Sequence, residues 1–591
     1  MKEKLKGKRW YICTFIITFA YRMLRIRGVY GMRVATDDIG MLSGAAYLAG
    51  YDWSSVVSTT KYYGQGWYFL FAPVLKFVEN PATIWAIIVI VNICIVALAC
   101  VFLQYMGIKY LGLADDFITC LISVTASMAV IPQVELSQEP ILFCLTVIIS
   151  YLLLKSVQEK NSIFRSCVFM ILAVIICTYA YLIHTRAVVL FIAIPVVLLA
   201  SELKRRKKLI SFGLYAAVAA ILYFTANILK KMIIHRIWGT GNTIMNAELP
   251  ISRSTFQALF SFKGIRVIFD CFVSNFFTAC MRLYGIPCMV VLLVIITLIH
   301  IFKKNGVNND NGIAGNRRVL LVFSFTCFFV GMAGVAAMWG RGAVSTYWTD
   351  ETNVYYKGFC YFRYYATFVG PALLVALGER FENEKYSKRL WLPILGIYGG
   401  VVLYYLLIIL RRISQSEYAN RAVLQYTVYT DQELDILNLV LSIGIALIIL
   451  AVILCAGKYS KYGLIAAIII NAVIPFSITE EGIISKPTMG TVGDAGYNLI
   501  RDMEQDGIEI PELYCADERW ACFYQFFLKE KRIIVGCPTE ESRTLVFHSN
   551  DIREDERLEG LPESYKCIIL DDNECVWVSD KELYGYILNM E

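Results

Sequence analysis

Two adjacent carboxylates, Asp37 and Asp38, follow the first apolar segment of the chain and precede an aromatic-rich loop. An ionisable group so close to a membrane boundary needs a reason. A carboxylate within hydrogen-bond reach of an attacking hydroxyl is an ordinary general base, so either Asp could take up a proton there. A solvated loop is the plainer alternative. The segments that surround residues 36–73 in the fold decide between a general base and a solvated loop.

Composition places the chain in a membrane. Hydrophobic residues make up 58% of its 591 residues, charged residues make up 17%, and the mean hydropathy is +0.57. The net charge of +7 falls in short basic clusters between apolar runs. This is the loop bias of multi-pass membrane proteins. We therefore expect a polytopic α-helical membrane protein and no nucleic-acid partner.

About thirteen apolar segments could cross the roughly 30 Å of hydrocarbon in a bilayer as helices. They are 10–24, 83–103, 117–133, 140–156, 167–183, 187–203, 209–229, 284–301, 319–338, 361–377, 390–410, 434–455 and 464–478. The apolar segment 66–78 is short for a span, and we expect it to be an interfacial or re-entrant helix. The eighteen Cys are scattered without a CxxC pair, which favours packing over a zinc site.

The basic loops indicate which side each segment faces, because cytoplasmic loops carry an excess of Lys and Arg. With a basic, uncleaved N-terminus inside, the cytoplasmic loops are those that hold Lys155, Lys160 and Arg165; Lys204 to Lys208; Lys303, Lys304, Arg317 and Arg318; Arg380, Lys385, Lys388 and Arg389; and Lys458 and Lys461. Four arginines break this rule. They flank the outer end of the first span, where cations are well placed to meet an anionic head group. They are Arg22, Arg25, Arg27 and Arg33.

The outer face then receives the acidic pair, the polar turns near 137–140 and 184–186, the segment 230–281, and the loops 339–362 and 411–433. We therefore expect a site that faces the exterior at the membrane surface.

Two domains follow from the change in composition after residue 478. Residues 1–479 form the transmembrane domain, with a first outer loop at 25–66. Residues 480–591 form a small extracytoplasmic α/β domain, with strands at 513–515, 532–535, 544–547 and 567–570 and helices at 517–531 and 581–588. This domain has no Gly-rich phosphate loop and no nucleophile motif, so a lid, acceptor recognition and structural capping all stay open.

Several motifs occur in order over residues 10–380 and carry a resemblance to a known family. After the acidic pair come AAYLAGYDW (45–53), YYGQGWYFLFAPVLKF (62–77), SQEP (137–140), HTR (184–186) and YFRYYATFVGP (361–371). The succession resembles the bacterial GT-C superfamily of polytopic glycosyltransferases, which includes protein O-mannosyltransferases and aminoarabinose transferases. That family typically has Asp-Glu or Glu where this chain has Asp37 and Asp38, so either Asp could hold the family's role.

The resemblance implies transfer of a sugar, with inversion, from a polyprenyl-phosphate carrier to a cell-envelope glycan, lipid or protein at the outer face of the cell membrane. Asp38 would be the general base, with Asp37 as the alternative. Arg186 and Arg363 would bind the carrier phosphate, because the guanidinium fork matches phosphate oxygens. Lys61 and His184 are further candidates for the same phosphate. For each Arg, a side chain that snorkels to the interface is the plainer alternative.

Three further residues would support the site. Glu139 could hydrogen-bond in the cavity or support a metal, and it could equally stabilise a helix N-terminus. Tyr62 and Tyr63, with Trp67 and Tyr68, could line the route of the prenyl chain. A divalent ion is the one cofactor considered, and His184 has no partner at ligand spacing for it.

Two other classes of function remain. A flippase or transporter for polyprenyl lipids or polysaccharides would explain many spans and polar outer loops, but the chain shows no internal repeat. A non-catalytic scaffold for polysaccharide assembly would have no need of the acidic pair.

Overall fold

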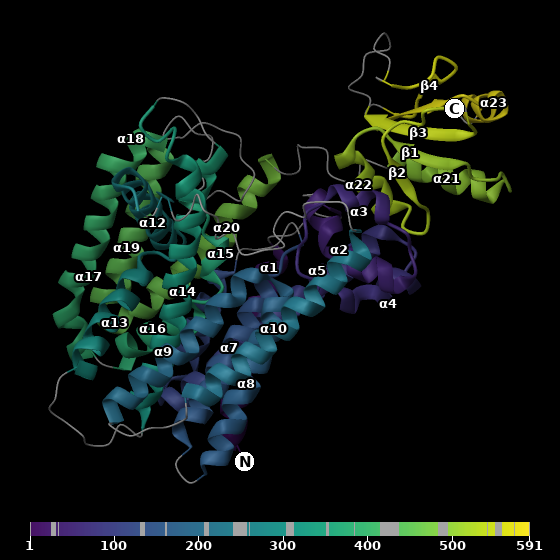
Figure 1. The fold of residues 1–591 in the computed structure, drawn as a ribbon. Helices are drawn as coiled ribbons and strands as arrows, with labels where there is room; N and C mark the ends of the chain where they lie inside the picture. Colours follow the sequence, from purple (N-terminus) through teal and green to yellow (C-terminus); the bar gives the residue numbers. More distant parts are fainter. Residues whose placement is uncertain are drawn as a thin grey trace.

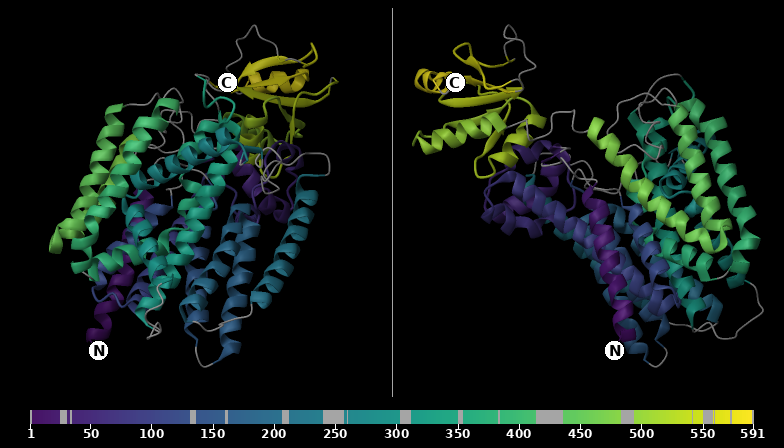
Figure 2. Two further views of the ribbon diagram at one scale, coloured as in Figure 1. Left: turned by 60° about the vertical axis from the view of Figure 1, so that its left-hand side comes forward. Right: turned by 180° about the vertical axis from the view of Figure 1, so that it is seen from behind.

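The computed structural model describes the chain except residues 1, 25–30, 33–34, 131–135, 160–161, 206–211, 240–256, 259, 303–311, 350–353, 383, 414–435, 483–493, 541, 550–557, 559, 572–573 and 590–591. Figure 1 shows a bundle of helices with the N-terminus at one end and a small sheet domain beyond the other end. The two further views in Figure 2 show the same separation. A polytopic helical fold with a small C-terminal α/β domain is thereby confirmed.

The first half of the bundle comprises α1 (Lys2–Leu24), α5 (Pro81–Leu111), α6 (Asp116–Ala126), η2 (Ser127–Ala129), α7 (Glu139–Gln158), α8 (Ile163–Ile183), η3 (Thr185–Ala187), α9 (Val188–Arg205) and α10 (Phe212–Ile237). Local signals set the bounds of the long helix α5. Asn80 caps its start by accepting the Thr83 N–H, Pro81 occupies the first turn, and Gly112 follows its end with φ +71°.

The segment between α1 and α5 contains α2 (Ala35–Ala49), α3 (Ser54–Thr59), η1 (Tyr68–Phe71) and α4 (Ala72–Phe77). The segment 66–78 is thus two short helical turns, and Pro73 lies in the first turn of α4. In Figure 1 these elements lie at the end of the bundle that faces the sheet domain.

The second half comprises α12 (Phe262–Arg282), α13 (Ile286–Phe302), α14 (Ile313–Ala343), η4 (Val354–Cys360), α15 (Arg363–Ala366), α16 (Gly370–Glu382), α17 (Glu384–Tyr404), the π-helix η5 (Tyr405–Ile409), α18 (Leu410–Ile413), α19 (Ile436–Cys455), η7 (Gly457–Tyr459) and α20 (Ser460–Gly482). The predicted span 361–377 is broken, because the helical segments on either side of residue 367 are bent by 74°. Pro371 has no N–H with which to continue a helix from α15.

Helix α12 was not predicted, because residues 230–281 were interpreted as an outer segment. Helix α12 packs along one end of α14, where Ile268 of α12 lies against Gly340 of α14. Helix α13 packs toward the other end of α14, where His300 of α13 and Arg317 of α14 line one cavity. Gly285, with φ +72°, makes the break between the two helices. Helices α12 and α13 therefore lie one after the other along α14.

Within the described residues, eight helices are long and apolar enough to cross a membrane, or nine if the bent pair at 355–382 is one span. The multi-pass character is confirmed, and the number of about thirteen stays a prediction. In the predicted span 117–133, α6 ends at Ala126 and the short η2 ends at Ala129, while residues 131–133 lie outside the described residues.

Arg22 differs from the prediction. Its side chain is 1% exposed, and its guanidinium donates to the carbonyls of Ser127 at 3.3 Å and Val130 at 3.1 Å. It therefore binds the end of η2 inside the protein and cannot meet a lipid head group. The other predicted outer cations, Arg25, Arg27 and Arg33, lie outside the described residues.

The C-terminal domain comprises α21 (Asp494–Gln505), β1 (Glu512–Cys515), α22 (Glu518–Phe527), β2 (Ile533–Val535), β3 (Thr544–Ser549), β4 (Lys566–Ile569), β5 (Glu574–Val578) and α23 (Lys581–Leu588). The strand order is β2-β1-β3-β5-β4. Strand β1 is parallel to β2 and β3, and β5 is antiparallel to β3 and β4. The sheet is therefore mixed, with β2 at one edge.

Candidate functional site

The acidic pair lies in the first turn of α2, where the helix dipole favours negative charge. The two carboxylates have different surroundings. Asp38 is fully buried, and its Oδ1 accepts the Leu136 N–H at 2.9 Å. Asp37 is partly exposed, and its Oδ1 accepts the Tyr63 hydroxyl at 2.6 Å. Asp37 thus has the more accessible carboxylate, while Asp38 contacts the backbone just before α7.

The aromatic loop is tied to α2 and to the end of α8. The side-chain amide of Gln65 donates to the carbonyls of Gly40 and Tyr63, at 2.8 Å each. Gly64 lies so close to α8 that a Cβ there would be 2.1 Å from the Ile183 carbonyl oxygen. Only glycine permits this approach. The loop therefore holds Tyr63 beside Asp37.

The second part of the site is an ion pair between η3 and the start of α7. An Arg186 guanidinium nitrogen lies 2.7 Å from Glu139 Oε1, and the side chains are 11% and 4% exposed. The Arg186 Nε and Nη1 atoms, together with Glu139 Oε2, are buried and have no hydrogen-bond partner in the described part of the chain. Unpaired buried donors on a guanidinium are costly, so this arrangement is suited to an anionic ligand.

Tyr364 connects the two arginines. The Arg186 guanidinium lies 4.9 Å from the centre of its ring, the Arg363 guanidinium lies 5.7 Å from it, and the His184 ring lies 6.1 Å away. The Arg363 charge also acts on the Tyr63 hydroxyl, which bonds Asp37. The predicted phosphate-binding arginines and the acidic pair are therefore brought into one region.

Two pKa shifts fix protonation states in this region. Burial raises the pKa of the Tyr63 hydroxyl well above its ordinary value, and the negative charge of Asp37 adds to the rise, so Tyr63 stays a donor. Burial lowers the pKa of His184 well below its ordinary value, and the charges of Arg186 and Lys230 lower it further. The neutral imidazole accepts the Arg186 backbone N–H at Nδ1, at 3.1 Å. His184 therefore shapes the turn that carries Arg186.

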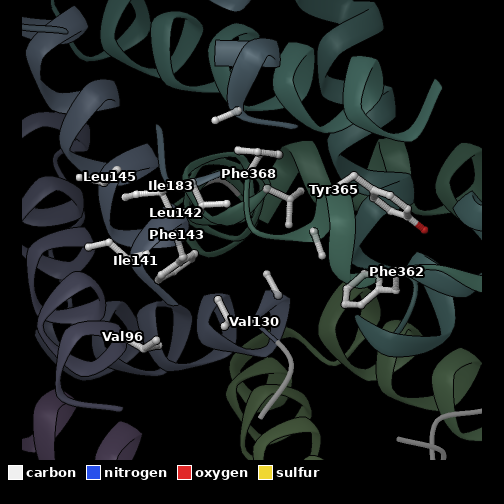
Figure 3. Packing of buried hydrophobic residues seen from close by; sticks show 14 of the residues in the cluster. Val96, Val130, Ile141, Leu142, Phe143, Leu145, Ile183, Phe362, Tyr365 and Phe368 are labelled. Carbon is white, nitrogen blue, oxygen red and sulfur yellow. The ribbon is translucent and has the colours of Figure 1, made fainter. Parts of the chain in front are cut away.

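Side chains that pack in the core stand beside these site residues in sequence. Figure 3 shows Ile183, which precedes His184, near Leu142 and Phe143 of α7. Phe362, which precedes Arg363, is 3% exposed. Close packing of such neighbours restricts where the polar side chains can lie.

Lys230 was missed by the sequence interpretation, which ended the preceding span at residue 229. It lies in α10, is 4% exposed, and its ammonium is 5.6 Å from the ring centres of both Tyr62 and Tyr181. Its charge acts on His184. A lysine at the end of a long apolar run is itself a signal of function.

Several predicted residues have other roles or lie apart. Lys61 is exposed, and no contact joins its ammonium to the described site residues. Three of the aromatics that were predicted to line a prenyl route are buried. Tyr62 packs on Trp238, the Trp67 indole N–H donates to Asn92 at 2.9 Å, and the Tyr68 hydroxyl donates to the Ser137 carbonyl at 2.7 Å. Tyr68 therefore positions the turn that leads to Glu139.

The acidic residues of the site already have partners within the protein. Asp37, Asp38 and Glu139 each have one oxygen engaged, by a hydroxyl, a backbone amide and a guanidinium. Across the described ranges, no group of three or more His, Cys, Asp or Glu side chains could hold an ion. The divalent ion considered from the sequence stays a prediction.

The fold and the site define a polytopic membrane protein with a cationic and acidic region at one end of its bundle. No family model and no curated protein matches the chain. Among solved structures it is similar to ArnT from Cupriavidus metallidurans bound to undecaprenyl phosphate, with a TM-score of 0.45, 11% identity and coverage of 97% of this chain and 98% of that chain.

A second similar structure is ArnT from the same organism in the apo state, with a TM-score of 0.43, 11% identity and coverage of 98% and 99%. A third is the archaeal oligosaccharyltransferase AglB from Archaeoglobus fulgidus in complex with an inhibitory peptide and a dolichol-phosphate, with a TM-score of 0.44, 10% identity and coverage of 90% and 65%. All are GT-C superfamily membrane glycosyltransferases, the class that the sequence motifs resemble. At these identities and TM-scores, the function proposed below rests on this chain's own side chains.

Proposed function

We propose that the protein is an inverting glycosyltransferase that moves a sugar from a polyprenyl-phosphate carrier to an acceptor at the outer face of the membrane. The observation that carries this proposal is the Arg186 guanidinium, whose buried Nε and Nη1 have no partner among the described residues. Phosphate oxygens are the ligands that match such a fork. The carrier phosphate would therefore complete the hydrogen bonds that the chain leaves open.

The reaction assigns a role to each half of the site. The acceptor oxygen forms a bond to the anomeric carbon of the sugar while the bond from that carbon to the phosphate oxygen breaks. The acceptor proton passes to a carboxylate, and polyprenyl phosphate leaves with the electron pair. Arg186 and Arg363 stabilise the charge that develops on the leaving phosphate. Lys230 adds a third positive charge nearby.

We assign the general base to Asp37, although the sequence interpretation favoured Asp38. Asp37 is partly exposed, whereas Asp38 is fully buried against the Leu136 N–H. A base must reach the acceptor, so the accessible carboxylate suits the role better. Tyr63 holds Asp37 through its hydroxyl. Asp38 then acts as a positioning residue that ties α2 to the segment before α7.

The sidedness of the reaction is part of the proposal. The acidic pair and the C-terminal domain lie at one end of the bundle, and the basic N-terminus lies at the other (Figure 1). The positive-inside tendency would place that N-terminus in the cytoplasm. The acceptor is then a glycan, lipid or protein of the cell envelope.

Carrier release tests the reaction. Protein purified in lipid and given a radiolabelled polyprenyl-phosphate sugar is expected to release free polyprenyl phosphate in the presence of an envelope extract as acceptor. Asp37→Asn is expected to slow the release by about 10²- to 10⁴-fold. Movement of the intact carrier across the bilayer without release would contradict the enzyme and favour a flippase.

Labelling tests the sidedness. Single cysteines would replace the exposed residues Asp52 and Arg165, in a background where the exposed Cys455 and Cys567 are Ser. In intact cells, an impermeant reagent is expected to label position 52 and leave position 165 unlabelled. Labelling of both positions from the outside would overturn the assigned topology.

A further inference from the structure

The C-terminal domain is docked on the first outer loop through a buried contact. The indole N–H of Trp53, which is 3% exposed, donates to the Lys529 carbonyl at 2.9 Å. The Phe526 ring lies edge-on to the fully buried Trp85, with centroids 6.0 Å apart. Buried aromatic anchors of this kind dominate the energetics of interfaces. The domain is therefore fixed at the outer loop by more than its covalent linker.

The loop also protects the edge of the sheet. Strand β2 is an edge strand, and the Val535 N–H donates to the Ser55 hydroxyl of α3 at 3.0 Å. Arg532 adds a contact to Asp52 at 3.4 Å, although both side chains are more than half exposed. An uncovered edge would expose unpaired backbone groups. The first outer loop thus covers the edge strand of the sheet.

Lys529 is the most unusual residue of this interface. It is 5% exposed, and its ammonium donates to the Leu75 carbonyl at 2.6 Å and the Val78 carbonyl at 2.5 Å. These carbonyls lie at the C-terminal end of α4, where backbone acceptors are left without helical partners. The Tyr51 hydroxyl donates to the same Leu75 carbonyl at 3.3 Å. A lysine of one domain therefore caps a helix of the other.

This cap is connected to the acidic pair through α2. Helix α2 packs against α4 on one side and against α22, the helix that leads to Lys529, on another. The charges of Asp38 and Asp37 also reach the buried Cys522 of α22 and help to raise its pKa, beyond the rise caused by burial. Movement of α4 or α22 would therefore move the helix that begins with the two acids.

We propose that Lys529 is a positioning residue for the transfer reaction, which makes the C-terminal domain a part of the catalytic site. The inference rests on the proposed function for its kinetic consequence. Lys529 holds α4, α4 supports α2, and α2 carries Asp37. Burial of an ammonium is costly, and its retention is explained if it fixes a geometry that the reaction needs.

The test uses the full-length protein in lipid and three variants. Lys529→Met removes the cap while it keeps the bulk of the side chain, and Lys529→Arg keeps a donor group. Lys531→Met is the matched control, because Lys531 pairs with Glu504 inside the C-terminal domain at 2.7 Å. The measurements are kcat and KM for the polyprenyl-phosphate sugar and amide hydrogen exchange of residues 35–78 without substrate.

We expect Lys529→Met to lower kcat by about tenfold or more, with KM changed less than about twofold, because the base is misplaced while the phosphate site is intact. Exchange in 35–78 is expected to rise. Lys529→Arg is expected to restore most of kcat, and Lys531→Met is expected to match the wild type. A wild-type kcat in Lys529→Met, or a loss confined to KM, would overturn the proposal.

Two outcomes need measurements of their own: a Lys529→Met variant that does not fold, and a wild type that releases no carrier phosphate. If Lys529→Met does not fold, Trp53→Phe removes the N–H that bonds the Lys529 carbonyl while it keeps an aromatic ring, and it is expected to lower kcat and raise exchange in the same segment. If the wild type itself releases no carrier phosphate, the proposed function fails. Exchange unchanged in Lys529→Met would then still refute the cap, and a local rise in 35–78 would uphold it.

Discussion

Two ion pairs of the same composition and length occur at opposite ends of α5 and differ in how completely they are satisfied. Near the end where α5 begins, Arg186 lies 2.7 Å from Glu139; beyond the other end of α5, Arg317 lies 2.7 Å from Glu379. The Arg317 guanidinium also donates to the Leu111 carbonyl at 3.0 Å. Arg186 leaves two buried donor atoms without a partner among the described residues.

Burial separates the two ion pairs. Arg317 and Glu379 are 20% and 22% exposed, so water reaches them, and Arg317 joins α14 to α5 and α16. Arg186 and Glu139 are 11% and 4% exposed, and their spare hydrogen-bonding atoms are hidden from water. Such atoms are costly unless a ligand meets them. We therefore place the proposed carrier-phosphate site at the incomplete pair.

The largest expected effect separates the two acids within the site. Asp37→Asn is expected to lower the transfer rate by about 10²- to 10⁴-fold, because the amide cannot take up the acceptor proton. Asp38→Asn is expected to lower the melting temperature and to keep more of the rate, since Asp38 is buried against Leu136. Rates and melting curves of both variants in lipid check this. A greater loss of rate in a well-folded Asp38→Asn than in Asp37→Asn would return the base to Asp38.

The next effect is a loss of carrier affinity at the incomplete pair, Arg186 and Glu139. Arg186→Lys keeps a charge for Glu139 but lacks the planar fork, so the affinity for polyprenyl phosphate is expected to fall by about 10- to 150-fold, the range for losing one hydrogen bond to a charged group. Native mass spectrometry with polyprenyl phosphate measures it. Arg317→Lys is the matched control and is expected to keep the wild-type affinity. Equal losses in both variants would remove the distinction between the pairs.

In the Arg317–Glu379 pair, a substitution is expected to change stability and to leave carrier affinity unchanged. Arg317→Ala is expected to destabilise the protein by about 1 kcal/mol, since the pair is partly exposed and screened by water. The melting temperature in lipid should fall, while carrier affinity and transfer rate stay near wild type. A loss of carrier affinity with an unchanged melting temperature would assign Arg317 to binding instead.

A smaller effect, on the melting temperature, depends on pH and on His184. Because the folded-state pKa of His184 lies well below its ordinary value, only the unfolded chain takes up this proton near pH 6. Its contribution to stability is present above about pH 6.5 and is lost as the pH falls below that value. The melting temperature of His184→Asn, relative to wild type, should therefore be higher at pH 5.5 than at pH 7.5. A difference independent of pH would contradict an imidazole that stays neutral in the folded protein.

The smallest expected effect is at Lys61, which the sequence suggested as a phosphate ligand. Its ammonium is exposed and contacts none of the described site residues. Lys61→Ala should change the affinity for polyprenyl phosphate by less than about twofold, the measure of a surface charge that is screened by water. A tenfold loss would place the carrier phosphate nearer to the aromatic loop than to Arg186.

Sequence patterns predicted elements whose signals are local. The helix predicted at 581–588 coincides with α23, because Asp580 caps its start by accepting the Leu583 N–H. Strand β5, which begins at Glu574, was missed. In the fold, Glu574 is fully buried and accepts the Tyr524 hydroxyl at 2.8 Å. Such a partner lies fifty residues away, and no local pattern reveals it.

The site shows the same limit. The motifs identified Asp37, Glu139, Arg186 and Arg363 by residue type, and the structure brings them into one region. Which acid is accessible, and which arginine has unpaired donors, depends on contacts between distant segments such as Asp38 with Leu136. Arg22 was interpreted as an outer cation for this reason: its partners are carbonyls about 105 residues away.

We propose that the buried donors of Arg186 receive the carrier phosphate. A structure of the wild-type protein in lipid with polyprenyl phosphate bound tests it most directly. We expect a phosphate oxygen at about 3 Å from Arg186 Nε or Nη1, with the Glu139 contact kept. A phosphate bound away from Arg186, with those donors met by the protein's own groups, would contradict the account.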